Sequence, residues 1–427
     1  MSATNLVLGP QNVRAEAIPA PPLRVSFSWT LAGNFIYAVT QFGVLSVLAK
    51  LGNPAVVGQY ALALAITAPV FMFTNLQLRG VQATDARHEY EFSDYFTLRC
   101  LSTLAGILTI SVIAALSHYD RRTKLVILLI TLAKAIESFS DVIAGHLQKI
   151  ERLDQAARAL MIRGITSVVV FATLFWLTRS LVLSVLAQTV AWLSAILLYD
   201  FRVASRVLGP VRLFFRFSPG TLKNLVEVSW PLGLVMTLLS LNTNVPRYIL
   251  ESRLGVAELG IFSSLAYMLT AMNLIVLALG QSVSARLSRF FAEGNKRSFN
   301  LLMRKLIIFS IGFGAVGAFL ALVAGREVLT LVYRPEYAGH QELLVVMVVD
   351  AATMAVGSFL GFGMTAVRSF RPQVPIMTAS LIVSVALTFA LIPRFGLLGA
   401  GYALMIASLI RVVASQVVLG SALKRVA

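Results

Sequence analysis

The sequence is poor in charge and poorer still in cysteine and histidine. Only 13% of its 427 residues are charged, and its acidic residues number 19 against 36 lysines and arginines. The single cysteine, Cys100, excludes an intramolecular disulfide, and the four scattered histidines form no metal-binding pattern. A Gly-x-x-x-x-Gly-Lys-Ser/Thr loop is also missing, which argues against ATP hydrolysis. We therefore expect no catalytic residue, no metal and no cofactor.

The uncharged parts of the sequence contain long apolar runs. Hydrophobic residues make up 58% of the chain, more than the core of a water-soluble protein needs. Runs of about 20 residues are long enough to cross a hydrocarbon layer about 30 Å thick, and helices satisfy their own backbone amides in lipid. The sequence therefore predicts an all-α polytopic membrane protein with about twelve transmembrane helices. The predicted spans are 27–49, 57–79, 97–117, 125–147, 159–177, 181–199, 226–249, 256–284, 305–323, 342–366, 373–392 and 398–420.

Lysine and arginine predict the orientation of these spans. With the N-terminus in the cytoplasm, the cytoplasmic connectors and span ends carry about 24 basic residues against about 10 on the other side. We therefore predict a protein of the cytoplasmic membrane with both termini inside, a flexible tail at 1–26 and a short tail at 421–427. Because much of the net charge of +17 is explained by topology, nucleic acid is not an expected partner.

The two halves of the chain resemble each other. Gly58-Gln59-Tyr60-Ala61 follows the first span, and Gly260-Ile261-Phe262-Ser263 follows the seventh. Six spans per repeat give two parallel halves, 27–199 and 226–420, around a central cleft. The connector 200–225 alternates phenylalanine with arginine near its centre, which is typical of an interfacial amphipathic linker or of a plain snorkelling connector.

Charged residues inside the spans are candidate functional residues, because each costs about 2.5–3.5 kcal/mol to insert. Lys134, Glu137 and Asp141 share one face of the fourth span, where they face the cleft or where Lys134 and Glu137 neutralise each other. Asp350 and Arg411 lie deep in the tenth and twelfth spans, where they contact substrate or pair with each other.

Two groups of candidates follow from this reasoning. The acidic residues Glu137, Asp141 and Asp350 are candidates for coupling transport to H+ or Na+. For the amides, hydrogen bonding between helices is the alternative to lining the cleft. The predicted substrate-cleft residues are Arg79, Lys134, Arg247, Arg411, Asn34, Asn242 and Asn244.

Three runs of sequence resemble a known family. LAKLG at 48–52, followed by VGQYALA at 57–63, resembles the opening of the polysaccharide-biosynthesis flippases, the Wzx-like branch of the multidrug/oligosaccharidyl-lipid/polysaccharide (MOP) exporter superfamily. NLQLRGVQATD at 75–85 and IPRFGLLGAGYA at 392–403 extend the similarity. The resemblance implies a flippase that moves an undecaprenyl-pyrophosphate-linked oligosaccharide to the outer leaflet for O-antigen, capsule or exopolysaccharide assembly, beside a polysaccharide polymerase and glycosyltransferases.

Three other functions stay open at this point. A peptidoglycan-precursor flippase of the same superfamily typically has fourteen helices, whereas this sequence has room for about twelve. A drug/cation antiporter would need an acidic cleft, whereas the deep charges here are mixed. A membrane glycosyltransferase or polymerase needs a large external loop, whereas the predicted outer connectors are short.

Overall fold

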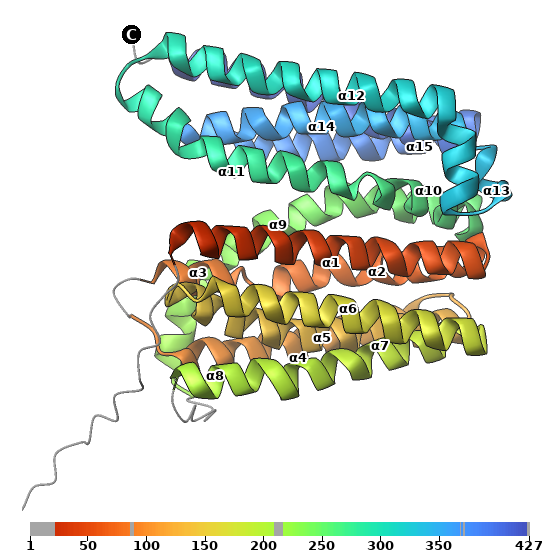
Figure 1. Ribbon diagram of the computed structural model, residues 1–427, viewed down its shortest axis with the longest axis horizontal. Helices are drawn as coiled ribbons and strands as arrows, with labels where there is room; N and C mark the ends of the chain where they lie inside the picture. The colour runs from red at the N-terminus through yellow and green to blue at the C-terminus, as the bar shows by residue number, and fades with distance from the viewer. Residues whose placement is uncertain (1–21, 86–88, 209–216, 368, 370–371, 425–427) are drawn as a thin grey trace, which may run out of the picture.

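The computed structural model describes residues 22–85, 89–208, 217–367, 369 and 372–424, and nearly all of them are helical (Figure 1). The N-terminal half contains α1 (Leu23–Leu51), α2 (Pro54–Thr74), α3 (Leu78–Thr84), α4 (Phe92–Leu116), α5 (Arg121–Lys149), α6 (Leu153–Thr178), α7 (Leu181–Ala195), the π-helical turn η1 (Ile196–Asp200) and α8 (Phe201–Leu208). The C-terminal half contains α9 (Pro219–Leu254), α10 (Val256–Met268), α11 (Thr270–Ala292), α12 (Lys296–Val332), α13 (Pro335–Ala338), α14 (Gln341–Ala366) and α15 (Gln373–Lys424).

The predicted membrane-spanning fold is confirmed. Within the described residues, ten helices or helix runs are long and apolar enough to cross a membrane. Two further predicted spans complete the twelve. One is α5, which carries charged residues along its length, and the other is the second arm of α15. The two arms of α15 meet at Gly396, whose φ of 56° breaks the helix, and Ser380 donates to the carbonyl of Ala407 across them.

Several predicted span boundaries differ from the observed helices. The seventh span, predicted to begin at 226, begins at Pro219 of α9. The second span ends at Thr74 rather than 79, because Leu76 and Gln77 adopt a φ of 50° and turn the chain into α3. The eighth span is divided near Leu269, where α10 gives way to α11. The ninth helix, α12, extends from Lys296 to Val332, well beyond the predicted 305–323. In the linker 200–225, residues 201–208 are helical, and its aromatic and basic centre at 209–216 lies outside the described residues, as does most of the tail 1–26.

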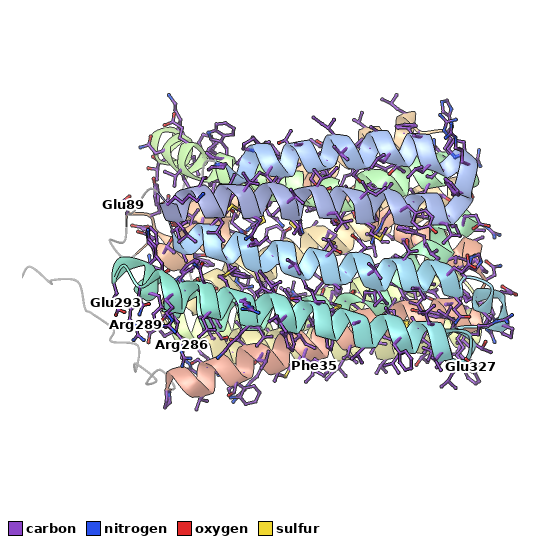
Figure 2. The ribbon with its side chains drawn as sticks, turned by 90° about the horizontal axis from the view of Figure 1, so that it is seen from above. Phe35, Glu89, Arg286, Arg289, Glu293 and Glu327 are labelled. Carbon is purple, nitrogen blue, oxygen red and sulfur yellow. The ribbon has the colours of Figure 1, made fainter. Side chains whose placement is uncertain are left out.

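The helices form two groups with charged ends and an apolar girdle. In Figure 1 the helices of the C-terminal half lie above those of the N-terminal half, with α9 between them. We call the end where α1 begins the inner end and the opposite end the outer end, following the predicted orientation. Figure 2 shows Arg286, Arg289 and Glu293 at the inner end and Glu327 toward the outer end, with the exposed ring of Phe35 between them.

The two halves are joined at the outer end. Gly58 of α2 packs against the backbone of Val256, and Gly260 of α10 packs against the backbone of Pro54 and Gly58 so closely that neither glycine has room for a Cβ atom. Arg334 Nη1 also donates to the carbonyl oxygen of Gly52 at 2.7 Å. Because Gly58 and Gly260 occupy matching positions of the repeated motif, the two halves meet through equivalent surfaces.

Candidate functional site

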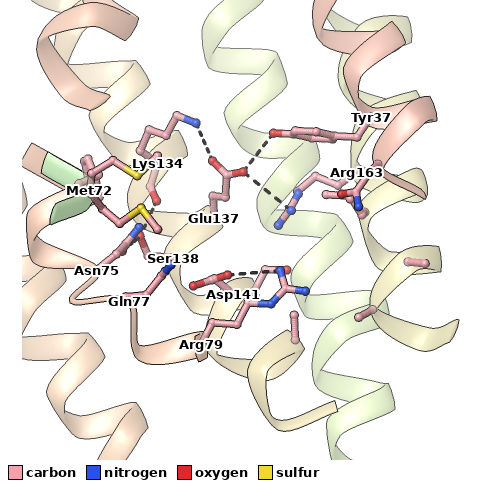
Figure 3. A pocket seen from close by; sticks show the side chains of 18 of the residues that line it. Tyr37, Met72, Asn75, Gln77, Arg79, Lys134, Glu137, Ser138, Asp141 and Arg163 are labelled. Atoms are coloured by element: carbon pink, nitrogen blue, oxygen red, sulfur yellow. Dashed lines mark hydrogen bonds and ion pairs between the residues drawn. The ribbon is translucent and has the colours of Figure 1, made fainter. Parts of the chain in front are cut away.

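A polar cavity lies in the inner part of the N-terminal half, which we call the N-half cavity (Figure 3). Its volume is about 390 Å³, and α1, α2, α5 and α6 form its walls, with Met236 of α9 at its edge. Five of the predicted site residues line it. Three of them lie on one face of α5, as their spacing in the sequence predicted. These residues are Asn34, Arg79, Lys134, Glu137 and Asp141.

Glu137 lies at the centre of the first charge network in this cavity. Lys134 Nζ is 2.7 Å from Glu137 Oε2, and Arg163 Nη2 is 3.9 Å from Oε1. The hydroxyl of Tyr37 donates to the same Oε1 at 3.0 Å, as Figure 3 shows. Lys134 and Glu137 therefore line the cavity and also form the ion pair that the alternative predicted.

Asp141 lies at the centre of a second network one turn further along α5. Arg99 Nη2 is 3.1 Å from one carboxylate oxygen, and Arg79 Nη1 is 3.6 Å from the other. The side chain of Arg99 is fully buried and also donates to Asn75 Oδ1, which accepts a second hydrogen bond from Ser138. Asp141 therefore has two cationic partners before any ligand arrives.

Residues 75–85, the run that resembles the flippase family, contribute Asn75, Gln77 and Arg79 to the cavity lining. Asn75 orients Arg99, and Arg79 reaches Asp141. Asp85 ends the run and forms an ion pair of 3.0 Å with Lys149 at the end of α5. Burial opposes the charge of this carboxylate, but hydrogen bonds from the Glu89 backbone and from Lys149 outweigh it and lower the pKa of Asp85. The run therefore fixes α3 against α5.

Three residues of the charge networks were not among the sequence candidates: Tyr37 and Arg163, which line the cavity, and Arg99, which binds Asp141. Arg99 and Arg163 lie inside predicted spans, so the rule that a charge in a span is costly and functional applied to them as well. Tyr37 gave no such signal, because a tyrosine on an apolar helix is ordinary.

Replacing Arg99 with alanine should strongly destabilise the fold. The substitution leaves Asp141 and Asn75 without their buried partner, and breaking a buried ion pair from one side costs about 3–5 kcal/mol. The melting temperature of the purified protein in detergent should fall much further for this variant than for Leu104→Ala, a control at an exposed apolar position of the same helix. Equal melting temperatures for the two variants would contradict this role of Arg99.

A second polar cavity, the C-half cavity, has a volume of about 370 Å³ and lies between α9, α10, α11, α14 and α15. Four predicted site residues line it: Asn242, Arg247, Asp350 and Arg411. Asn244 lies outside both linings. It donates to the carbonyl of Ser240 and accepts from Arg247 Nη1 at 3.2 Å, so it orients a cleft residue rather than lining the cleft.

Asp350 and Arg411 do not form the predicted alternative ion pair. The two residues share the cavity, but their charged atoms are more than 4 Å apart. Among the described residues there is also no group of three or more His, Cys, Asp or Glu side chains that could hold a metal ion.

Comparison with known proteins places the chain in a family. The sequence profile of the family described as polysaccharide biosynthesis protein matches residues 23–285, more than half of the chain. The chain belongs to this family. It is 27% identical over 389 residues to the capsular polysaccharide biosynthesis protein CapF of Staphylococcus aureus, an alignment that covers 91% of this chain and 97% of CapF.

Two solved structures share the fold of this family member. The lipid II flippase MurJ in an inward closed conformation matches with a TM-score of 0.76 at 12% identity, over 94% of this chain and 90% of MurJ. An inward-facing multidrug resistance MATE family transporter of the MOP superfamily matches with a TM-score of 0.63 at 16% identity, over 96% of each chain. The predicted all-α, two-lobed membrane fold is thereby confirmed.

Proposed function

We propose that this protein is a flippase that moves a polyprenyl-pyrophosphate-linked oligosaccharide across the cytoplasmic membrane by alternating access, for assembly of a surface polysaccharide. The observation that carries the proposal is a polar, cation-bearing cavity in each half of a membrane-spanning member of the polysaccharide biosynthesis family. The names of CapF and MurJ support it, because one refers to capsular polysaccharide and the other to a lipid-linked precursor.

The two cavities supply the hydrogen-bond partners and the positive charges that such a substrate lacks in the bilayer. A pyrophosphate joined to sugars loses its hydration in hydrocarbon, which costs several kcal/mol for each unsatisfied polar group. Asn34, Asn75 and Gln77 offer amides for sugar hydroxyls in the N-half cavity, and guanidinium groups in either cavity offer charge-assisted hydrogen bonds to phosphate. The polyprenyl chain stays in lipid throughout.

The contact between α2 and α10 supports the alternating step. Since the halves are joined at the outer end and the N-half cavity lies in the inner part, the described state is suited to receive substrate from the inner side. Opening of the Gly58 and Gly260 contact would then release substrate outward. A transporter of this kind needs no catalytic group, which distinguishes it from the glycosyltransferase or polymerase alternative.

Deletion of the gene tests this function. Complete lipid-linked repeat units should accumulate on the cytoplasmic face, and surface polysaccharide should be lost, with both defects reversed by the wild-type gene. Extraction of lipid-linked intermediates and quantification of surface polysaccharide measure the two outcomes. Normal surface polysaccharide would favour the antiporter, and repeat units left outside but unpolymerised would favour a polymerase.

A further inference from the structure

The two cavities differ in how their charges are paired. In the N-half cavity each carboxylate, Glu137 and Asp141, lies within 4 Å of two basic side chains. Each carboxylate is thus neutralised without a ligand, although Nε and Nη1 of Arg163 are buried without a hydrogen-bond partner. The two carboxylates of the N-half cavity therefore have their counter-charges before substrate binds.

The charges of the C-half cavity have no such partners. It contains Arg247, Arg411 and Asp350, and among the described residues none of them lies within 4 Å of an opposite charge. The Nε atoms of both arginines and Oδ1 of Asp350 are buried without a hydrogen-bond partner. Buried polar atoms are nearly always satisfied, so three orphaned atoms on the charged residues that line one cavity indicate a ligand that completes the site.

Arg411 is positioned for such a ligand by a glycine. Its Nη2 donates to the carbonyl oxygen of Met354 at 3.4 Å. A Cβ atom on Gly357 would lie 2.9 Å from Nη2 and 3.1 Å from Nε, so the missing side chain at this position makes room for the guanidinium group. The arginine is thus held at the cavity wall from one side only.

Arg247 is held in the same way on the facing helix. Its Nη1 donates to Asn244 at 3.2 Å, and its guanidinium group lies over the ring of Tyr267 at 5.8 Å from the centroid. Two guanidinium groups with free donor edges suit an anion with several oxygens, because the planar fork of each can bind two phosphate oxygens at once.

We infer that the C-half cavity binds the pyrophosphate group of the lipid-linked substrate through Arg247 and Arg411, and that Asp350 competes with this group for the two guanidinium groups. The inference rests on the proposed function, since it assigns one part of that substrate to one cavity. Uptake of a proton from the aqueous cleft by the Asp350 carboxylate removes the competing charge. Binding of the pyrophosphate group and protonation of Asp350 therefore favour each other.

Asp350 faces few groups that could change this balance. From α12, which packs on α14 through Gly314 and Ala352, no titratable residue reaches the cavity lining. Among the described residues, the charged or titratable groups that line the cavity with Asp350 are three: Arg411 from α15, Arg247 from α9 and Tyr267 from α10. The other polar residues of the lining are neutral: Asn242, Thr243, Thr270, Asn273, Ser380 and Ser408.

Binding of a short polyprenyl pyrophosphate to the purified full-length protein tests the site. Isothermal titration with geranylgeranyl pyrophosphate, with geranylgeraniol as the uncharged control, should show a loss of affinity of about tenfold or more for Arg411→Gln and for Arg247→Gln. Lys223→Gln, at an exposed position near the start of α9, the helix that carries Arg247, should change affinity by no more than about twofold. Unchanged affinity in both arginine variants, or an equal loss in Lys223→Gln, would overturn the assignment.

A variant that keeps every charge excludes a trivial effect of charge removal. Gly357→Ala should displace the Arg411 guanidinium and weaken binding by about tenfold. Gly361→Ala, one turn away on the same helix, has nothing within 4 Å of its new Cβ and should bind as the wild type does. Because alanine favours a helix in both variants, unfolding does not explain a difference between them. Equal binding by the two would argue against the positioning of Arg411.

The competition with Asp350 is tested by pH. Asp350→Asn should bind the pyrophosphate more tightly than the wild type at neutral pH, and the ratio of the two affinities should approach one as pH falls, because the wild-type carboxylate is then also neutral. Titration of the ligand itself cancels in this ratio. Equal affinities at every pH would overturn the competition.

The proposed function and the site can fail separately. If the wild-type protein flips a lipid-linked oligosaccharide in proteoliposomes while both arginine variants bind pyrophosphate with unchanged affinity, the site is wrong and the function stands. If binding requires both arginines but no lipid-linked oligosaccharide is flipped, the function is wrong and the C-half cavity remains a site for polyprenyl pyrophosphates.

Discussion

Substitution of Gly58 with valine should reduce flipping about a hundredfold or more. A Cβ atom at this position overlaps the backbone of Val256, so the outer end can no longer close in its described form. Overpacking by a single methyl group costs about 1–3 kcal/mol, and each 1.4 kcal/mol changes a two-state ratio tenfold. Alanine should therefore shift the protein away from the outer-closed state by about 10–100-fold, and the larger valine further still.

Flipping of a fluorescent lipid-linked oligosaccharide in proteoliposomes measures the activity, and thiol labelling measures the state. Leu62 lies one helical turn from Gly58 on the same face of α2 and is fully buried. In a Cys100→Ser background, Leu62→Cys should resist a membrane-impermeant maleimide and should become reactive when Gly58→Val is added. Gly312→Val, on α12 with open space at the new side chain, is the matched control. Loss of flipping without any gain in labelling would contradict the closure mechanism.

The glycine contact illustrates how far the sequence predicts this fold. The repeated motif at Gly58 and Gly260 indicated two related halves, and in the structure α2 and α10 pack closely at these two glycines. Sequence periodicity could not predict the contact itself, because it places a residue on a helix face without fixing which helix covers that face. The same limit explains why the break at Leu269 was missed, since neither proline nor glycine marks it.

The candidate site was predicted in part for similar reasons. The spacing of Lys134, Glu137 and Asp141 predicted that they share one face of a helix, and in the structure all three line one cavity. Pairing between helices was beyond this reasoning. Asp141 meets Arg99 of α4, whereas Asp350 and Arg411 share a cavity without forming an ion pair. Distances between helices depend on tilt and packing, which no single segment encodes.

Glu137→Gln should reduce flipping by at least about tenfold and lower the stability of the protein by about 3 kcal/mol. The substitution leaves Lys134 and Arg163 side by side in the cavity wall without their shared counter-charge. This estimate takes the low end of the range for a broken buried pair, because the Glu137 side chain is 23% exposed. Melting temperature in detergent and flipping in proteoliposomes measure the two effects.

The double variant Lys134→Gln/Glu137→Gln decides what the pair does. It removes one charge of each sign, so the net charge of the wall equals that of the wild type. Arg163 loses its counter-charge but keeps the rings of Tyr37 and Trp192, and the amide at 137 still accepts a hydrogen bond from Tyr37. If the pair serves to shape the N-half cavity, the double variant should regain most of the melting temperature and flipping that Glu137→Gln loses. A double variant that is stable yet inactive would instead make Lys134 a direct contact of the substrate, and would move part of the anionic headgroup from the C-half cavity to the N-half cavity.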